Sequence, residues 1–352
     1  MNILIIPDPT APNGEDALCR EVSRRSLPRG HRTSVQAVPN GPLAAVIEEL
    51  SAASFASKAD LVLLNSLQPA PLLAARQAGK KLAIRLIDAY TGASAQALAE
   101  ISGLAFQADL LIIPSRFLED QVLSWPRNGA HGPPKIAVIP YAYDKIRAQQ
   151  ITVVTMRASR PSGFPLVTAG VLNEATRPGM ETLLASLTRL RMDCHLTVIG
   201  EGPALPALRA RAERLVVSDK VTFAGGMPHD KIMEFLRASK AYVDPCGLDG
   251  FPMLALHAMS EGCPVVAVRA GALPELVNDG ENGLLFPMGE AMALSEAVVT
   301  LSSVRGMSLK LIAGGIATVE RHSWEATVAS ILTALESVVG ASHTNGTPAP
   351  RP

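Results

Sequence analysis

The stretch that decides the fold runs from Tyr242 to Val268 and reads YVDPCGLDGFPMLALHAMSEGCPVVAV. It starts at the end of an apolar run, passes through turn residues, continues with apolar residues at helical spacing, and closes on a β-branched run. Pro252 suits the first turn of the helix, because the N–H group that proline lacks has no helical partner there. The pattern predicts a strand, a tight loop, a helix and a buried strand. The helix then opens beside the carboxyl end of a strand, where doubly wound sheets bind anions.

The same alternation of strands and helices continues on both sides of this stretch. Predicted strands are 3–6, 33–37, 61–64, 82–87, 110–113, 136–139, 166–169, 195–199, 221–223 and 264–268, and predicted helices are 16–26, 43–51, 72–78, 95–106, 116–125, 181–190, 204–216 and 229–238. Such alternation implies right-handed crossovers and parallel sheets. Residues 145–163 interrupt the alternation of strands and helices, and this segment ends in basic residues with Pro and Gly. We place the crossing between two domains there.

Composition narrows the class of protein. The chain has 352 residues, of which 48% are hydrophobic, 18% charged and 4% aromatic, so two domains with aliphatic cores are expected. The formal net charge is zero. This balance argues against a nucleic-acid partner and against a strongly anionic membrane held by bulk electrostatics.

Cysteine usage and the chain start indicate a compartment. The four cysteines show no C-x-x-C pairing, which predicts small core residues in a reducing environment rather than a zinc site or a disulfide framework. The first residues, MNILIIP, form an apolar strand without the basic region of a signal peptide, and no apolar run reaches membrane-spanning length. We therefore expect a cytoplasmic protein. Peripheral membrane contact stays open, although no basic amphipathic helix stands out in the first domain.

Several motifs resemble one family. The residues DGFPMLALHAMSEGCPVVA at 249–267 resemble the donor-site signature of glycosyltransferase family 4, and AGALPELVNDGENGLLF at 270–286 is similar to the segment that follows it in that family. HLTVIGEGP at 195–203, VTFAG at 221–225 and RHSWE at 321–325 also fit. The resemblance covers most of the chain, is strong from about 195 to 290, and is weak before 145.

The resemblance implies the GT-B fold, an α/β architecture of two doubly wound, Rossmann-like domains that face a cleft. We expect an acceptor-side domain at 1–147, a linker at 148–163, a nucleotide-sugar-binding domain at 164–320, a helix at 321–340 that crosses back to the first domain, and a disordered tail at 341–352. The tail is rich in Ser, Thr and Pro, which favours disorder.

The family resemblance also implies an activity: a retaining, metal-independent glycosyltransferase that uses a nucleotide-sugar and needs no cofactor. In that reaction negative charge develops on the leaving diphosphate, and preorganised cations and helix-terminal N–H groups stabilise it. The helix start at 252–254 supplies such groups in this chain. The acceptor is expected to be a glycan, a lipid-linked acceptor or a small molecule.

Two residues replace the paired glutamates of the family signature. Asp249 stands at the first position and is the candidate catalytic carboxylate beside the donor sugar; otherwise it is a loop carboxylate that binds backbone N–H groups. His257 stands at the second position, where the resemblance implies contact with the ribose; otherwise it is a structural histidine. A neutral imidazole accepts one hydrogen bond where a carboxylate accepts several, which predicts weaker nucleotide binding.

The diphosphate-binding cations of the family are also replaced. The segment GVLNEATRPG at 170–179 has Val171 and Pro178 where the family has Arg and Lys. Arg177, one residue away, and Arg269, at the carboxyl end of a strand, are the candidate substitutes. The alternative for both is a solvated surface arginine.

The remaining candidates belong to the binding site of the donor or to that of the acceptor. Donor-binding candidates are Gly250, Phe251, Pro252, Met253, Leu254, Gly170, Gly202 and Glu275, and the acceptor-side candidates are Asp88, Asn13 and Gly14. Asp88 would orient an acceptor hydroxyl as a second catalytic residue, or else cap a strand end. Glu275 would recognise the donor sugar, or else cap a short helix.

Two other classes stay open. The four altered positions in one site fit a pseudo-glycosyltransferase that binds a nucleotide or sugar, or that serves as the partner of an active glycosyltransferase. Other two-domain enzymes of this architecture, such as sugar-nucleotide epimerases, are the remaining alternative.

Overall fold

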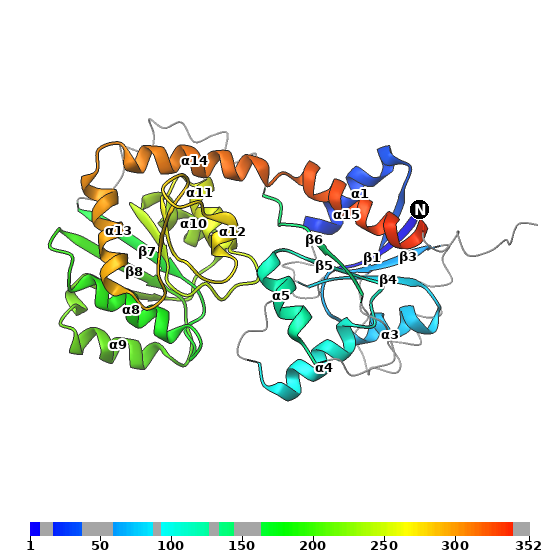
Figure 1. Cartoon of the computed structure of the whole chain (residues 1–352), viewed down its shortest axis with the longest axis horizontal. Coiled ribbons are helices and arrows are strands. Elements are labelled where there is room, and N and C mark those ends of the chain that lie inside the picture. The colour runs from blue at the N-terminus through cyan, green and yellow to red at the C-terminus, as the bar shows by residue number, and fades with distance from the viewer. Residues whose placement is uncertain (8–16, 37–58, 87–92, 127–133, 144–162, 341–352) are drawn as a thin grey trace, which may run out of the picture. The chain divides into compact units, whose positions relative to one another are not determined.

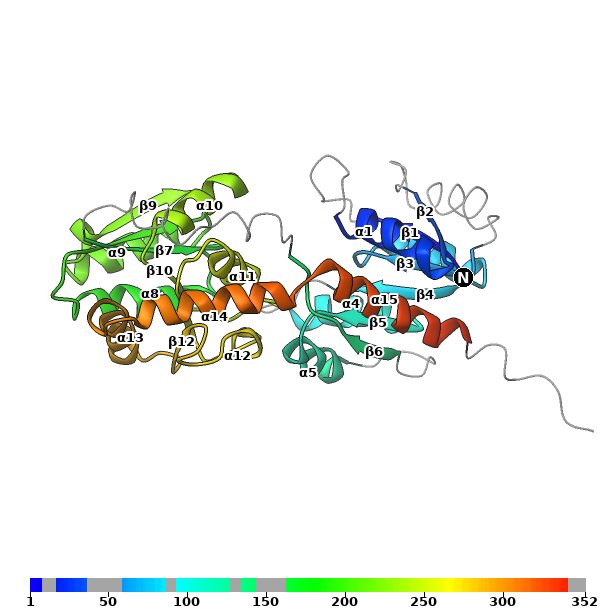
Figure 2. The same ribbon diagram turned by 90° about the horizontal axis from the view of Figure 1, so that it is seen from above.

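The computed structural model describes residues 1–7, 17–36, 59–86, 93–126, 134–143 and 163–340. Contacts divide the chain into two compact units. The N-terminal unit comprises Met1–Ala142 and Trp324–Pro352, and the C-terminal unit comprises Tyr143–Ser323 (Figures 1 and 2). The predicted linker at 148–163 lies, except for Gly163, outside the described residues, and so does the predicted tail at 341–352.

A six-stranded parallel sheet organises the N-terminal unit, in the order β2-β1-β3-β4-β5-β6. Its strands are β1 (Asn2–Ile6), β2 (Arg32–Val35), β3 (Leu61–Leu64), β4 (Lys81–Arg85), β5 (Leu110–Ile113) and β6 (Lys135–Val138). Its helices are α1 (Ala17–Ser26), the 3-10 turn η2 (Leu27–Arg29), α3 (Pro69–Gln77), α4 (Ala95–Ala105), α5 (Arg116–Ser124) and α15 (Trp324–Val339).

Strand alternation separates two apolar cores in this unit. Leu4, Leu64 and Ile84 point to a core covered by α3, α4 and α5. Ile3, Leu63 and neighbouring residues point to the opposite core, which α1 and α15 cover. Side-chain caps start two of these helices, because Ser94 Oγ accepts from Ala97 N at 3.2 Å and Ser115 Oγ accepts from Leu118 N at 3.1 Å.

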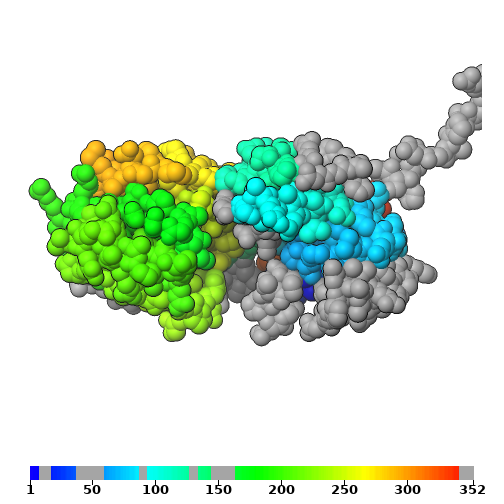
Figure 3. Space-filling model, turned by 90° about the horizontal axis from the view of Figure 1, so that it is seen from below, coloured from blue at the N-terminus to red at the C-terminus, as the bar shows by residue number. Residues whose placement is uncertain are grey.

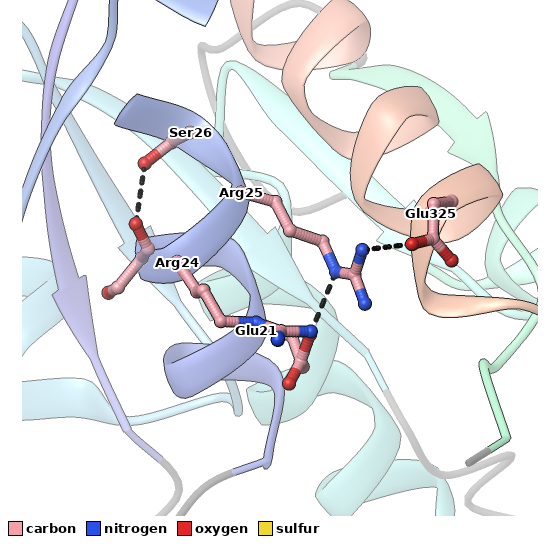
Figure 4. A network of polar contacts seen from close by, with 6 residues as sticks. Glu21, Arg24, Arg25, Ser26 and Glu325 are labelled. Carbon is pink, nitrogen blue, oxygen red and sulfur yellow. Dashed lines mark hydrogen bonds and ion pairs between the residues drawn. The ribbon is translucent and has the colours of Figure 1, made fainter. Parts of the chain in front are cut away.

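Polar contacts attach the last helix to the N-terminal unit. Arg25 on α1 bridges Glu21 on its own helix and Glu325 on α15, and Arg24 also contacts Glu21 (Figure 4). Burial alone would raise the pKa of Glu21, but the hydrogen bonds from Arg24 and Arg25 lower it overall. The return of the C-terminal helix to the first unit therefore rests on apolar packing and on an arginine shared between two helices.

A second six-stranded parallel sheet organises the C-terminal unit, in the order β12-β11-β10-β7-β8-β9. Its strands are β7 (Phe164–Ala169), β8 (Cys194–Ile199), β9 (Val221–Gly225), β10 (Ala241–Asp244), β11 (Val265–Val268) and β12 (Leu284–Phe286). Its helices are α8 (Arg177–Leu187), α9 (Leu205–Arg214), η3 (Ser218–Lys220), α10 (His229–Ala238), α11 (Met253–Ser260), α12 (Leu273–Leu276), α13 (Ala291–Ser303) and α14 (Met307–Arg321).

The helices of this unit form two groups. Helix α8 packs against α9 and α13, whereas α11 packs between α10 and α14. Figure 3 shows α8 and α9, in green, on the surface of the unit. The strand β10 lies near the middle of the sheet between β7 and β11, and all four of its residues are buried. The loop that leaves β10 is therefore held by a rigid, central strand.

The predicted elements correspond well to the described ones. Strands 61–64 and 110–113 match their predicted bounds, and so does helix 229–238. Helix α8 is an exception, since it begins at Arg177 rather than at the predicted residue 181. Pro178 fits the first turn of a helix, where a missing N–H is tolerated. The predicted helix at 43–51 lies outside the described residues.

The cysteine prediction holds for three of the four residues, since Cys19, Cys194 and Cys263 are buried and Cys246 is half-buried; all four are free. Within the described ranges, no single helix is both long and apolar enough to cross a membrane. Helices α13 and α14 reach the required length and hydropathy only as a pair, and the pair is bent by 101°.

Candidate functional site

The junction between β10 and α11 starts with a buried carboxylate. Asp244 ends the strand, and its Oδ1 accepts hydrogen bonds from Cys246 N at 3.1 Å and Gly247 N at 3.2 Å. The Tyr242 hydroxyl lies 3.4 Å from the other carboxylate oxygen. Burial raises the pKa of Asp244, although these three hydrogen bonds act in the opposite direction. A side chain thus fixes the first turn of the loop by standing in for a backbone acceptor.

Glycines allow this loop to press against the loop that follows β11. Gly247 has φ +62°, and a Cβ built there would lie 2.8 Å from the carbonyl oxygen of Ala270. Gly271 has φ +60°, and a Cβ built there would overlap the carbonyl oxygen of Gly247. Both positions therefore need glycine for conformation and for space. The two loops at the carboxyl edge of the sheet are locked together at backbone level.

The start of α11 has fewer free amides than the sequence suggests. Pro252 occupies the N-cap position without a side-chain hydrogen bond to the helix, and proline has no N–H. Met253 N donates to the carbonyl oxygen of Phe251 at 2.8 Å. Of the three predicted amides at 252–254, Leu254 therefore supplies the first one that these bonds leave available. Phe251 and Pro252 are buried, while Met253 and Leu254 are half-buried.

His257 lies on α11 in a cluster of aromatic rings. Its ring centroid is 4.8 Å from that of His229 at the start of α10, and 5.2 Å from that of Tyr143. Phe251, six residues earlier, meets the ring of His322 edge-on at 5.7 Å. The side chain of His257 is half-buried. The imidazole thus packs against two other rings, and its two nitrogens carry its polar chemistry.

Both candidate arginines form ion pairs on the surface of the unit. Arg177 opens α8, with its guanidinium 3.2 Å from Glu174 and 3.8 Å from Glu181. Arg269 follows β11 and lies 2.7 Å from Asp279. Each guanidinium carries five N–H donors, so one or two carboxylates do not exhaust it. The positive charge at each place is nevertheless reduced before any ligand arrives.

The two other candidate glycines lie in loops that interlock. Gly170 follows β7 and donates its N–H to Ile199 at 3.0 Å. Gly202 follows β8, and a Cβ there would overlap the carbonyl oxygen of Leu172. Leu172 N in turn donates to the carbonyl oxygen of Glu201 at 2.9 Å. Close packing therefore accounts for the residue type of Gly202, whereas a Cβ built at Gly170 would meet no other atom within 4 Å.

The remaining predicted residues divide into two groups. Asp249 is exposed and Gly250 buried in the loop between β10 and α11, and Glu275 is exposed in the first turn of the short helix α12. Asp88, Asn13 and Gly14 lie outside the described residues, so the predicted acceptor-side candidates have no described geometry. Residues 249–257 and Arg269 come together at one edge of the sheet, beyond the ends of β10 and β11.

Sequence reasoning missed three residues of this site. Asp244 was placed only at a strand end, and neither Tyr143 nor His229 was considered. The signal for Asp244 was available, because an Asp that precedes Pro and Gly after an apolar run is typical of a turn fixed by its own side chain. The proximity of Tyr143 and His229 to His257 comes from tertiary packing and has no local signal.

The comparison with protein families bears on the same part of the chain. Residues 163–303 match the family model of glycosyl transferases group 1. The matched segment runs from the residue before β7 to the end of α13, so it contains all six strands of the second sheet and the junction between β10 and α11.

Curated relatives match a similar span. A D-inositol 3-phosphate glycosyltransferase from Acidothermus cellulolyticus is 36% identical over 164 residues, which are 45% of this chain and 34% of that protein. A phosphatidyl-myo-inositol mannosyltransferase from Mycobacterium leprae is 30% identical over 190 residues, 51% of this chain and 50% of the relative. The chain thus spans about a third to a half of the length of these relatives.

Solved structures match the whole fold. The Anabaena protein HepE, crystallised with UDP and glucose, has a TM-score of 0.72 at 19% identity, covering 96% of this chain and 100% of that one. Sucrose-phosphate synthase from Thermosynechococcus elongatus has a TM-score of 0.71 at 20% identity, covering 97% and 99%. At such identities the likeness concerns the fold alone. The prediction of an α/β GT-B fold with two Rossmann-like domains is confirmed.

Proposed function

We propose that this chain is a glycosyltransferase that moves a sugar from a nucleotide-sugar to an acceptor. The family match over 163–303 supports the class of activity. The observation that carries the proposal is the junction of β10 and α11, where a buried strand, two interlocked glycine loops and an uncapped helix start meet at the carboxyl edge of a parallel sheet. Ligands bind at this edge in doubly wound folds.

In the proposed reaction the diphosphate leaves from the anomeric carbon of the donor. The N–H of Leu254 and the positive end of the α11 dipole stabilise the charge that develops on the leaving oxygen. Asp249, which is exposed in the loop, faces the sugar as the catalytic carboxylate. The imidazole of His257 binds a ribose hydroxyl. We further propose that transfer retains the anomeric configuration and needs no metal ion.

Arg177 and Arg269 are proposed to hold the diphosphate. Each would have to share its donors between its carboxylate partner and a phosphate oxygen, which five N–H groups permit. Glu275 would contact the sugar, and Gly170, Gly202, Gly250, Phe251 and Met253 would line the donor. A cytoplasmic location remains part of this proposal, because donors of this type are charged and do not cross membranes unaided.

The ion pairs that Arg177 and Arg269 already form favour a second candidate function. Because Glu174, Glu181 and Asp279 already neutralise part of their charge, the site resembles a weak anion binder more than a strong diphosphate clamp. The alternative is a non-catalytic chain that binds a nucleotide or sugar, or that serves as the partner of an active glycosyltransferase.

Calorimetry with UDP, GDP and ADP tests the donor site of the purified chain. We expect saturable heat with one of them, weakened about tenfold or more by Asp249→Ala or by His257→Ala. Asp219→Ala and His195→Ala are matched controls, since both side chains are exposed elsewhere in the same unit. The absence of heat with every nucleotide contradicts the proposal.

Turnover separates the enzyme from the non-catalytic chain. With the nucleotide-sugar of the preferred base, the enzyme releases nucleoside diphosphate and continues to do so in EDTA. In the enzyme, loss of one hydrogen-bond donor to the leaving diphosphate lowers kcat about 10²- to 10³-fold. Binding without release of nucleoside diphosphate, with any acceptor mixture, would instead support the non-catalytic alternative.

A further inference from the structure

An arginine with two neutral partners stands at the carboxyl edge of the sheet in the N-terminal unit. Arg85 is the last residue of β4 and is half-buried. Its Nη1 donates to Asn65 Oδ1 at 2.8 Å, and its guanidinium carbon lies 4.3 Å from the centre of the Tyr141 ring. Among the ion pairs of the described residues, none involves Arg85. Its charge is therefore oriented by an amide and an aromatic face, and no carboxylate of the described residues neutralises it.

The three residues form a layer that strand alternation sets up. Leu63, Ala83 and Ile139 belong to the apolar core beneath α1 and α15. Two residues further along the same chain segments come Asn65, Arg85 and Tyr141. The face thus changes from apolar to polar in one step at the ends of the strands.

The layer is held firmly in place. Asn65 is 4% exposed, and its backbone N–H donates to the carbonyl oxygen of Ile6 at 3.0 Å. Near Tyr141, the first turn of α15 is anchored where Thr327 Oγ1 donates to the carbonyl oxygen of Pro140 at 3.3 Å. A guanidinium between a buried amide and an aromatic ring keeps one orientation.

That orientation leaves one edge of the guanidinium available. Nη1 is used by Asn65, and the flat face by Tyr141. Within the described part of the chain, Nε and Nη2 have no partner. These two N–H groups form the planar fork that binds two oxygens of a phosphate or a carboxylate at once.

The other edge of the same sheet shows the contrast. There Asp109, which precedes β5, pairs with Arg76 at 3.0 Å and with Lys81 at 3.2 Å. Half-buried cations at the amino edge thus receive a carboxylate from the protein itself. Arg85, at the edge where parallel sheets bind their ligands, receives none from the described residues. A half-buried charge without a countercharge is costly, and an anionic ligand removes that cost.

We propose that Arg85, oriented by Asn65 and Tyr141, binds an anionic group of the acceptor, either a phosphate or a carboxylate. The term acceptor in this inference depends on the proposed glycosyltransferase function. The inference narrows the acceptor from any glycan or small molecule to one that carries a negative charge near the accepting hydroxyl. Asn65 and Tyr141 are positioning residues for Arg85.

Arginine side-chain NMR tests the binding site without any assumption about activity. In the full chain labelled with 15N-arginine, the Nε–H signal of Arg85 is the one that disappears in Arg85→Lys. We expect inorganic phosphate to shift this signal saturably. Acetate should bind more weakly than phosphate if the site recognises a phosphate, and more tightly if it recognises a carboxylate. The signal of Arg29, an exposed arginine in the same unit, serves as the control.

Two variants sharpen this experiment. Asn65→Ala should weaken the binding of inorganic phosphate at Arg85 about 10-fold or more, because the guanidinium loses its orientation. Arg29→Lys should leave it unchanged. The inference is overturned if neither anion shifts the Arg85 signal, or if Arg29 shifts in parallel with the same midpoint, which would indicate screening by salt.

An acceptor panel then tests the role in transfer. Transfer from the preferred nucleotide-sugar is measured to neutral and anionic acceptors of matched structure. A hexose is compared with its 6-phosphate and with the hexuronic acid, and myo-inositol is compared with its monophosphate. We expect the anionic member to be preferred, and Arg85→Lys to raise its KM about 10- to 100-fold with a smaller change in kcat. Equal use of neutral and anionic acceptors overturns the inference while leaving the glycosyltransferase proposal intact. If no acceptor is used, the NMR result still decides whether the anion site exists.

Discussion

The Oδ1 atom of Asp244 accepts a hydrogen bond from the backbone N–H of Gly247 at 3.2 Å, so the last residue of β10 controls the loop that leads to α11. The carboxylate is buried and has no cationic partner in the described hydrogen bonds and ion pairs. It stabilises the loop through two backbone N–H groups and faces the Tyr242 hydroxyl. Its ionised form is therefore supported by hydrogen bonds alone.

Asp244→Asn should reveal a pH-dependent contribution to stability. Burial raises the pKa of Asp244 above its usual value of 3.8, so the folded chain binds the proton more tightly than the unfolded chain. Stability from this group is then fully present below pH 3.8 and is lost as pH rises through the folded pKa. Asparagine keeps the acceptor oxygen and carries no charge.

The measurement is urea unfolding of the C-terminal unit in both proteins at several pH values. We expect the free energy of unfolding of the variant, relative to that of the wild type, to increase between pH 4 and pH 7. Because other titrating groups are common to both proteins, they cancel in this difference. A difference that does not change with pH would show that the carboxylate titrates as it does in the unfolded chain.

Gly247→Ala should both destabilise the C-terminal unit and weaken nucleotide binding. The φ of +62° costs an alanine about 1–2 kcal/mol, and the contact with the Ala270 carbonyl adds about 1–3 kcal/mol. Gly280→Ala is the matched control, since Gly280 has φ +75° and open space around its Cβ position. Thermal unfolding gives the two losses. Equal losses would mean that the loops separate without cost and that their interlocking is unimportant.

The fold was accessible from the sequence because its signals are local. Short β-branched runs and helices with clear start and stop residues recur along the chain, and β3 and β5 match their predicted bounds. Helix α8 begins at Arg177, four residues before the predicted start, because Pro178 fits the first turn of a helix. The elements from β12 to α14 were not assigned individually, although Gly306, with φ +82°, separates α13 from α14.

Arg237→Ala should destabilise the C-terminal unit by leaving a charge without its partner. Glu261 follows α11 and is 2% exposed; its Oε2 accepts a hydrogen bond from Nε of Arg237 at 2.8 Å and forms an ion pair with Nη2 at 2.8 Å. Removing the arginine leaves a buried carboxylate, at a cost of about 1–3 kcal/mol. Chemical denaturation measures this cost.

A double-mutant cycle identifies its origin. Glu261→Gln removes the charge with little change in volume, so Arg237→Ala should cost much less in that background. If the two losses simply add, then the aliphatic stem of Arg237, and not its charge, provides the stabilisation.

The candidate site was less accessible from the sequence than the fold. Spacing identified the turn before α11 and the residues on it, since these follow one another along the chain. It did not reveal that Met253 N is occupied by Phe251, or that Arg269 pairs with Asp279, because such bonds depend on local backbone angles and on side-chain rotamers. Arg85 was not proposed as a site residue for a related reason, since only packing shows that no described carboxylate pairs with it.

His257→Glu tests whether this position of α11 faces the nucleotide. A carboxylate accepts several hydrogen bonds from ribose hydroxyls where a neutral imidazole accepts one, so the affinity for the preferred nucleoside diphosphate should rise about 10-fold in calorimetry. The substitution also removes ring contacts with Tyr143 and His229, which should cost about 1 kcal/mol of stability. His257→Gln is the control, because it loses the same ring contacts but gains no charge. If both variants lose stability equally and neither changes nucleotide affinity, then His257 packs the helix and takes no part in binding.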